Sequence, residues 1–218
     1  MNESNQTYAV DVHNMTHQFG SDIVLRQVNA RFTTGKIHGI VGRNGSGKTV
    51  LLKCILGFLY PTQGKAVVFG RQIGKDCQFA PDTGMMIEAP GFIPTESGYN
   101  NLSWLMGLHA KANRNRIDEV MRIVGLDPKS RKTVGKYSVG MRQRLGIAQA
   151  IMEEPQLLVL DEPLNGLDNR GVADMHQLFI DLRGRGVTII MASHNPLDIT
   201  ALCDTVSEMD GGVLTKKS

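Results

Sequence analysis

The sequence has few cysteines and no long apolar run. Its three cysteines, Cys54, Cys77 and Cys203, form no C-x-x-C pair, and their odd number argues against a disulfide framework. The longest apolar runs, such as residues 157–160 and 189–192, are far shorter than the ~18 residues needed to cross a bilayer. We therefore expect a chain that spans no membrane and works in a reducing compartment.

The sequence also lacks a dominant charge. Lys and Arg number 24 and Asp and Glu 21, which gives a formal net charge of +3. This charge is too small for a chain built around a polyanion, so nucleic acid is not expected as a partner. Residues 1–8 are polar and lack the apolar stretch and cleavage site of a signal peptide. These absences favour the cytoplasm.

Apolar residues and glycine are plentiful, and both bear on the fold. Hydrophobic residues make up 41% of the 218 residues, enough for a core, and the length predicts one domain with a sizeable insertion. Buried strands are predicted at residues 36–41, 157–160 and 187–192, and helical spacing recurs between and after them. The alternation predicts a mostly parallel sheet with helices on both faces, interrupted between about residues 88 and 153 by a helical insertion.

A glycine-rich segment follows the first of these strands. Residues 42–49 read GRNGSGKT, which fits G-x-x-x-x-G-K-[ST], and a helical pattern comes directly after. Glycines let backbone N–H groups turn toward phosphate oxygens, and the helix N-terminus adds partial positive charge. Here Lys48 would neutralise the β and γ phosphates of ATP, and Thr49 would ligate Mg²⁺. The candidate nucleotide-binding residues are Gly42, Asn44, Gly45, Ser46, Gly47, Lys48, Thr49 and Val50.

A second apolar strand ends in two carboxylates, in the segment LLVLDE at residues 157–162. In a P-loop nucleotidase, Asp161 would help to hold Mg²⁺ and Glu162 would polarise the attacking water. Charged residues also occur at the ends of ordinary strands, but the Lys48 loop upstream favours the catalytic interpretation. Lys48 and Glu162 are therefore candidate catalytic residues.

Three further segments accompany these motifs: one lies between the two motifs and two lie after the acid pair. Residues 137–145 read YSVGMRQRL, residues 163–168 read PLNGLD, and residues 192–194 read ASH. With them, nearly the whole chain resembles an ATP-binding cassette (ABC) ATPase, the nucleotide-binding subunit of an ABC transporter. The resemblance implies an α/β fold with a P-loop NTPase core, a mostly parallel sheet, an N-terminal antiparallel β part and an inserted helical subdomain. It implies one domain over residues 1–218, with the core at 1–87 and 154–218 and the helical signature subdomain at 88–153.

The segment at residues 137–145 looks like the family's signature motif. Ser138 is a plausible helix N-cap, and its hydroxyl and the neighbouring backbone N–H groups would form an anion site. In the family two cassettes bind head to tail, and the signature motif of each cassette completes the ATP-binding site of the other. The resemblance therefore implies that Ser138 and Gly140 contact the γ phosphate bound at Lys48 of a second copy.

Three residues outside these motifs also match family positions. His194 stands where the family has a histidine that contacts the γ phosphate and steadies the water, which makes it a candidate catalytic residue. Asp168 resembles the loop residue that communicates across the dimer. Phe19 looks like the aromatic residue that stacks on adenine, with a core aromatic as the alternative.

The chain departs from the family's pattern near the metal site. Where most members have a glutamine at the entry to the helical insertion, this chain has Glu88. A carboxylate can still ligate Mg²⁺, so Glu88 joins Thr49 and Asp161 as a candidate metal ligand. Gln78 is the rival, although the strand-like residues 84–87 lead to Glu88.

Two apolar substitutions complete the departures. Val50 stands where a second hydroxyl often follows the loop threonine, and Val139 replaces a signature glycine. Neither removes a candidate catalytic group, so hydrolysis of ATP is still expected.

The resemblance implies an ATPase that powers a separate membrane-spanning permease. The ATPase would act as a dimer of two cassettes and would bind peripherally to the cytoplasmic face of the cell membrane. Residues 87–94 and the SVGM form of the signature resemble export-type cassettes associated with antimicrobial peptides or drugs, of the bacitracin and lantibiotic type. The permease is expected to dock near residues 90–108, which include the exposed-looking aromatics Phe92, Tyr99 and Trp104. Packing in the core is the alternative for each of these three side chains.

Two other classes share parts of this pattern. The alternative function is a soluble ABC ATPase that acts as an ATP-driven switch in a non-transport complex. Such relatives usually carry two cassettes, coiled coils, zinc inserts or charged linkers, which this sequence lacks. A nucleotide kinase or GTPase would not explain residues 137–145, and the guanine-reading N-K-x-D element is absent.

Overall fold

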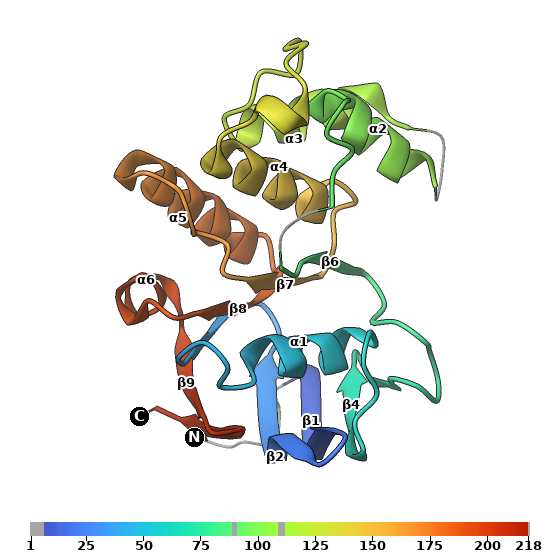
Figure 1. The fold of residues 1–218 in the computed structure, drawn as a ribbon, viewed down its shortest axis with the longest axis vertical. Helices are drawn as coiled ribbons and strands as arrows, with labels where there is room; N and C mark the ends of the chain where they lie inside the picture. The colour runs from blue at the N-terminus through green and yellow to red at the C-terminus, as the bar shows by residue number, and fades with distance from the viewer. Residues whose placement is uncertain (1–6, 89–90, 109–111, 218) are drawn as a thin grey trace.

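The computed structural model describes residues 7–88, 91–108 and 112–217. The polar N-terminal segment at residues 1–6, and residues 89 and 90 at the start of the expected docking region, lie outside the described residues. The chain forms two sheets and a set of helices, with the helical insertion at one end of the molecule (Figure 1).

The larger sheet has six strands in the order β10-β9-β3-β8-β7-β6. All neighbouring pairs are parallel except the β9–β10 hairpin. The strands are β3 (Ile37–Val41), β6 (Thr83–Met86), β7 (Leu157–Asp161), β8 (Thr188–Ser193), β9 (Thr205–Asp210) and β10 (Val213–Lys216). Because β3, β7 and β8 run in the same direction, their carboxyl ends meet at one edge of the sheet, where ligands bind in folds of this type.

The smaller sheet is antiparallel, in the order β2-β1-β4-β5. It consists of β1 (Tyr8–Phe19), β2 (Asp22–Thr33), β4 (Gln63–Val68) and β5 (Arg71–Gln72). Helix α1 (Lys48–Leu56) packs between the two sheets, and its Leu51, Leu52 and Ile55 are completely buried in one apolar cluster with residues of both. This burial fixes the N-terminus of α1 relative to both sheets.

The other face of the large sheet carries the remaining helices. Leu157 and Val159 of β7 point to the α1 side, whereas Leu158 and Leu160 belong to the opposite cluster, as the two-residue period of a strand requires. The helices between β6 and β7 are α2 (Gly98–Gly107), α3 (Arg114–Ile123), the 3₁₀ turn η2 (Val134–Lys136) and α4 (Val139–Ile151); α5 (Asn169–Gly184) and α6 (Pro196–Leu202) follow β7 and β8. The expected α/β fold with a helical insertion is therefore confirmed.

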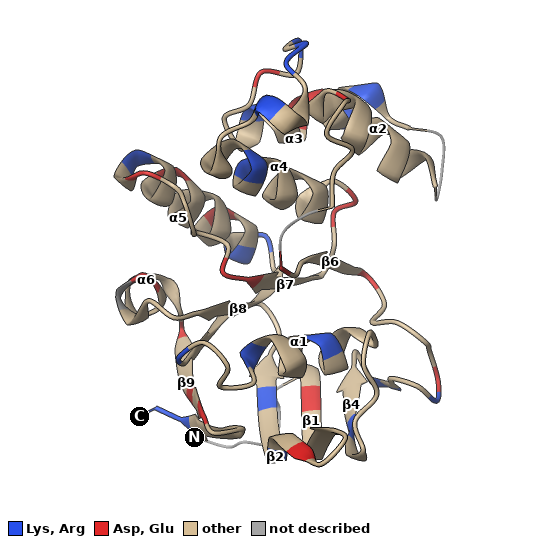
Figure 2. Cartoon of the chain, in the orientation of Figure 1, with Lys and Arg blue, Asp and Glu red and all other residues tan. Residues whose placement is uncertain are grey.

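Charged residues are distributed over both parts of the molecule, and Figure 2 shows Lys and Arg interspersed with Asp and Glu along the core and the insertion. The longest helix, α5, has 16 residues. Within the described ranges, no helix is long and apolar enough to cross a membrane. The three cysteines are all free.

Candidate functional site

The glycine-rich loop connects β3 to α1 at the carboxyl edge of the large sheet. Gly45 and Gly47 have φ angles of 78° and 109°, in the left-handed region that favours glycine. Gly47 immediately precedes α1, so the first-turn N–H groups of the helix and the loop face the same pocket of about 220 Å³. The lining of this pocket consists of Val24, Asn44, Gly45, Ser46, Gly47, Lys48, Thr49, Val50, Asp161 and Glu162. It therefore unites the two predicted motifs, 112 residues apart at the Thr49–Asp161 contact.

Lys48 is held inside the loop. Its side chain is only 5% exposed, and its Nζ donates hydrogen bonds to the carbonyl oxygens of Gly42 (2.7 Å) and Arg43 (3.1 Å). The same Nζ lies 3.9 Å from Oε1 of Glu162. Backbone oxygens thus orient the ammonium group toward the carboxyl end of β7.

Asp161 ends β7 directly opposite the start of α1. Thr49 Oγ1 donates a 2.6 Å hydrogen bond to Asp161 Oδ2, whereas Oδ1 is buried and has no hydrogen-bond partner among the described residues. Burial raises the pKa of the Asp161 carboxyl, the Thr49 hydroxyl opposes this shift, and the carboxylates of Glu162 and Glu88 add to it. A hydroxyl beside a buried carboxylate with an unused oxygen suits Mg²⁺, which prefers oxygen ligands.

Glu162 has an unusual backbone conformation. Its φ is 50°, a left-handed value that is uncommon for residues other than glycine. Its N–H donates to the carbonyl oxygen of Ala192 (2.8 Å), and its own carbonyl oxygen accepts a 2.7 Å hydrogen bond from Nε2 of Gln143. The backbone is therefore held by β8 on one side and by α4 on the other.

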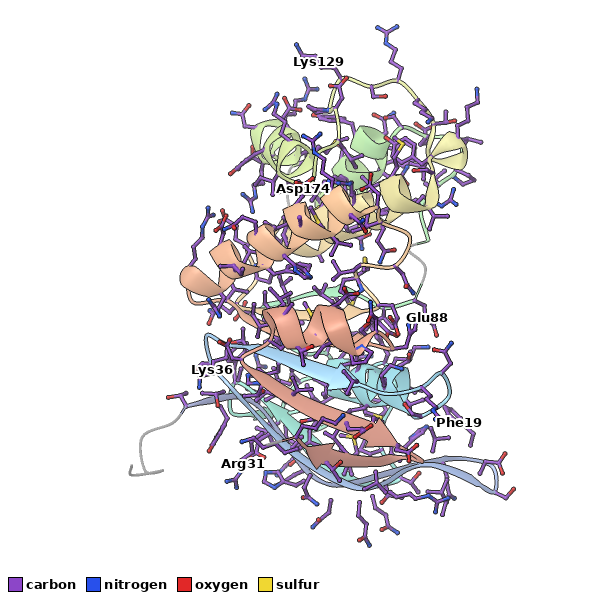
Figure 3. All side chains as sticks on the ribbon, turned by 90° about the vertical axis from the view of Figure 1, so that its left-hand side faces the viewer. Phe19, Arg31, Lys36, Glu88, Lys129 and Asp174 are labelled. Carbon is purple, nitrogen blue, oxygen red and sulfur yellow. The ribbon has the colours of Figure 1, made fainter. Side chains whose placement is uncertain are left out.

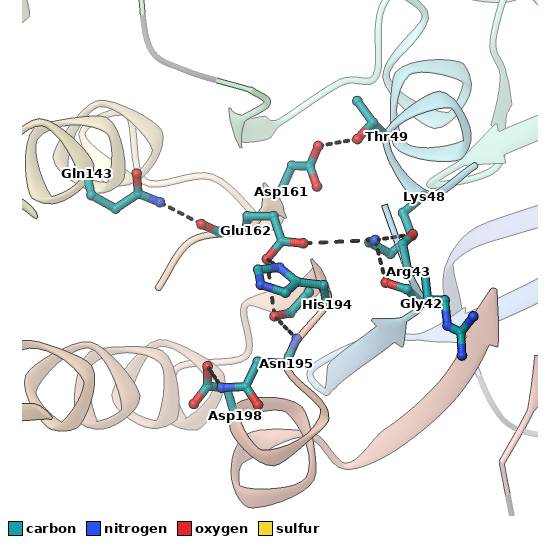
Figure 4. A network of polar contacts seen from close by, with 11 residues as sticks. Gly42, Arg43, Lys48, Thr49, Gln143, Asp161, Glu162, His194, Asn195 and Asp198 are labelled. Carbon is teal, nitrogen blue, oxygen red and sulfur yellow. Dashed lines mark hydrogen bonds and ion pairs between the residues drawn. The ribbon is translucent and has the colours of Figure 1, made fainter. Parts of the chain in front are cut away.

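The Glu162 carboxylate is oriented by two residues at the end of β8 (Figure 4). Oε2 lies 2.9 Å from Nδ1 of His194 and accepts a 3.2 Å hydrogen bond from Oγ of Ser193. Ser193 Oγ also accepts the backbone N–H of Asn195 at 3.0 Å, which fixes the hydroxyl. The structure thus brings the candidate catalytic residues Lys48, Glu162 and His194 together around one carboxylate.

Glu88 lies beyond the end of β6 and forms an ion pair with Lys53 of α1 at 2.6 Å. Glu88 is exposed, and its charge adds to the raised pKa of the Asp161 carboxyl. Gln78, the rival position, is exposed near the C-terminal end of α1, where its carbonyl oxygen packs against Gly57. Neither Glu88 nor Gln78 lines the pocket at Lys48, so the third oxygen ligand stays a prediction.

The signature segment lies apart from this pocket, at the start of α4. Ser138 is the N-cap, and its Oγ accepts the backbone N–H of Met141 at 3.1 Å. Gly140 approaches the carbonyl oxygen of Gly166 so closely that a Cβ at position 140 would lie 2.9 Å from it, and the Val139 side chain covers Gly166. The signature helix and the loop before α5 are therefore packed together.

Asp168 is the N-cap of α5, where Oδ1 accepts the N–H of Gly171 at 2.8 Å. It lines a cavity of about 680 Å³ with Ser138, Gly140 and Arg144. This cavity holds no residue of the Lys48 loop. One chain therefore does not bring the signature residues to its own phosphate-binding loop.

Phe19 ends β1 and is half exposed, packed edge-to-face on His17 with ring centroids 4.7 Å apart. It does not line the pocket at Lys48. Figure 3 shows Phe19 and Glu88 on the same side of the molecule. Phe19 is therefore not the core aromatic of the alternative interpretation, and its ring is available for stacking.

The expected docking region is less exposed than its sequence implies. Trp104 is 50% exposed, but Phe92 and Tyr99 are partly buried against the core. A groove of about 510 Å³ lies beside this region, between β6, α2 and the end of α4, and Leu105 and Leu108 line it.

Sequence reasoning missed three residues of the site: Lys53, Gln143 and Ser193. Lys53 has no local pattern that distinguishes it from other helix residues, and Gln143 lies in the signature segment at residues 137–145, where nothing local indicates its contact with Glu162. Ser193 could have been found, because it stands next to His194 at the end of a buried strand.

A family model described as "ABC transporter" matches residues 25–165. The chain belongs to the ABC transporter family. It is 40% identical over 205 residues, 94% of each chain, to the uncharacterized ABC transporter ATP-binding protein YybJ of Bacillus subtilis. It is 37% identical to the bacitracin transport ATP-binding protein BcrA of Enterococcus faecalis, over 96% of this chain and 69% of BcrA.

The fold is also similar to that of a solved ABC cassette. A dimeric post-hydrolysis structure of the ATP-binding cassette MJ0796, bound to ADP and Pi, superposes with a TM-score of 0.86 at 20% identity, covering 96% of this chain and 98% of that one. With the family membership, this confirms the predicted fold. The chain is an ABC ATPase, the ATP-binding and ATP-hydrolysing subunit of a membrane transporter.

Proposed function

We propose that Lys48, Glu162 and His194 carry out MgATP hydrolysis at the carboxyl edge of the large sheet, and that the energy drives export of a peptide antibiotic or similar drug. The observation that carries the proposal is the Glu162 carboxylate, which lies 3.9 Å from Lys48 and 2.9 Å from His194. A carboxylate so placed can accept the proton of a water that attacks the γ phosphate.

The other residues of the pocket bind and orient the nucleotide. The loop amides and the α1 N-terminus bind phosphate oxygens, and Lys48 exchanges its carbonyl contacts for the β and γ phosphates. Asp161 and Thr49 would hold Mg²⁺, and Glu88 would join them after release from Lys53. When bound, Mg²⁺ neutralises phosphate charge. Phe19 stacks on the adenine ring.

A second cassette completes the site. The Ser138 hydroxyl and the α4 N-terminus form an anion site, but within one chain they line a cavity separate from the Lys48 pocket. We infer that Ser138 and Gly140 contact the γ phosphate held by a second copy, with Asp168 at the same interface. A dimeric assembly of the similar cassette MJ0796 supports this arrangement.

The permease binds in the groove beside β6 and α2, on the cytoplasmic face of the membrane. Leu108 is 77% exposed and Met85 37% exposed at its rim, which gives an apolar surface for a cytoplasmic helix of a membrane subunit. The groove overlaps the expected docking region at Leu105 and Leu108. The relative BcrA is named for bacitracin transport, and it supports a peptide antibiotic as the cargo.

Affinity purification from detergent-solubilised native membranes tests the permease directly. We expect a polytopic membrane protein to copurify with the tagged chain and with Val213→Glu, which alters an exposed residue of β10, but not with Leu108→Glu. ATP hydrolysis by the purified complex should be stimulated by bacitracin or a related peptide. Recovery of soluble partners alone would favour the ATP-driven switch in a non-transport complex.

A further inference from the structure

Gln143 connects the helical insertion to the backbone of Glu162. It lies on the second turn of α4, and its Nε2 donates to the Glu162 carbonyl oxygen at 2.7 Å (Figure 4). The same oxygen accepts the Asn165 N–H at the longer distance of 3.2 Å. The amide of Gln143 therefore supplies the shorter of two bonds to this carbonyl.

The Glu162 backbone depends on such neighbours because its φ of 50° is unfavourable for a residue with a Cβ. A left-handed conformation persists where surrounding contacts determine it. β8 supplies the contact to the N–H through Ala192, and α4 supplies the contact to the C=O through Gln143. A change in the second contact alters the direction of the Cα–Cβ bond and hence the position of the carboxylate.

Helix α4 transmits position along its length as one body. Its Leu145, Ile147 and Ala148 are completely buried in an apolar cluster shared by the insertion and the large sheet, so tight packing holds the helix along its length. Ser138 and Gln143 are five residues apart on it, about 7.5 Å along the axis at the α-helical rise. A displacement of the Ser138 end therefore displaces the Gln143 amide.

We infer that Gln143 is a positioning residue that makes the alignment of Glu162 depend on the placement of the signature helix. When α4 is seated, the amide holds the Glu162 carbonyl and the carboxylate faces the Lys48 pocket. When α4 shifts, the bond breaks and hydrolysis slows although ATP remains bound. This inference rests on the proposed role of Glu162 as the group that accepts the proton of water.

Three substitutions at one position separate hydrogen bonding from packing. Gln143→Met keeps the length of the side chain but has no donor, and Gln143→Glu places an acceptor against the carbonyl oxygen. Gln143→His can return an N–H near the Nε2 position when the ring is neutral, so the assays are performed at pH 8. Gln177→Met is the matched control, because the Gln177 amide bonds only to the exposed Asp181 side chain of the same helix.

We expect kcat for ATP hydrolysis to fall about tenfold in Gln143→Met and Gln143→Glu, with KM within twofold of wild type. Gln143→His should recover most of kcat, and Gln177→Met should not differ from wild type. In hydrogen exchange, amides of residues 162–167 should exchange faster in Gln143→Met than in wild type. The exchange rates of the glycine-rich loop at residues 42–49 should be unchanged.

The inference is overturned if kcat stays within twofold of wild type in Gln143→Met and Gln143→Glu, or if the histidine variant loses as much as they do. It is also overturned if exchange at residues 162–167 is unchanged. Failure of the proposed function is distinguishable, because Glu162→Gln would then retain turnover whatever the Gln143 variants do.

Discussion

The core and the helical insertion differ in how their candidate nucleotide-binding groups are paired. In the core, the polar groups are already paired with one another: Lys48 with loop carbonyls, Thr49 with Asp161, and Glu162 with His194. In the insertion, Ser138 is exposed, and its hydroxyl accepts a hydrogen bond from the backbone N–H of Met141 in its own helix. We therefore expect the core to bind a nucleotide by itself, and we expect the insertion to contribute only when a second molecule brings a phosphate to it.

Lys48→Ala should impair nucleotide binding by the core and have the largest effect on ATP affinity. A charge-assisted hydrogen bond contributes about 1.5–3 kcal/mol, so the affinity for ATP should fall about 10- to 100-fold. Isothermal titration calorimetry on the purified chain measures this, with Lys65→Ala, an exposed lysine of β4, as the control. Unchanged affinity in Lys48→Ala would show that the loop does not hold the phosphates.

Ser138→Ala should distinguish the contribution of the insertion from that of the core. We expect ATP hydrolysis to fall about tenfold while the affinity of the isolated chain for ATP stays within twofold, because Ser138 lies outside its own pocket. Ser97→Ala is a matched control, since Ser97 caps α2 of the same insertion in the same way. Each variant should lose about 1 kcal/mol of stability, the usual cost of an N-cap. Equal turnover in the two variants would contradict a nucleotide role for Ser138.

Asp161→Asn should give the smallest effect, an increase in stability. Because the folded-state pKa of Asp161 is raised, ionisation of this carboxyl weakens the fold as the pH rises above the unfolded-state value of about 4, and the full cost is present above the folded-state pKa. In EDTA at pH 7.5, the melting temperature of the variant should be higher than that of wild type.

Measuring Tm at several pH values provides an internal control. As the pH falls well below about 4, the carboxyl becomes protonated in both states, so the difference in Tm between Asp161→Asn and wild type should shrink and vanish. A variant that melts lower than wild type at pH 7.5 would mean that the Asp161 charge stabilises the fold.

The sequence predicted what depends on local patterns. The loop at Lys48 follows a buried strand and precedes a helix, and Ser138 precedes an apolar-periodic segment, so both could be placed without coordinates. The strands β9 and β10 could not, because segments such as TVSEMD are only partly buried and mix polar with apolar residues. The sequence did not decide whether Phe92 and Tyr99 are exposed or packed against the core, because burial depends on packing partners remote in sequence.

The contacts that join separate elements were beyond prediction. Gln143 meets Glu162 across 19 residues, and Lys53 meets Glu88 across 35. Neither pair has a spacing that a helix or strand would bring together, so only the packing of α4 and α1 on the sheet determines them. The departure at Glu88 was visible in the sequence, but its cationic partner was not.

Measurement of ATP binding and turnover in Glu162→Gln tests the central claim most directly. The account predicts that the variant binds MgATP with near wild-type affinity, while its turnover falls by at least about 100-fold, the lower range for loss of a general base. Glu208→Gln, which removes an exposed carboxylate paired with Lys217, should retain full turnover. Wild-type turnover in Glu162→Gln would contradict the account, because the attacking water would then be activated elsewhere.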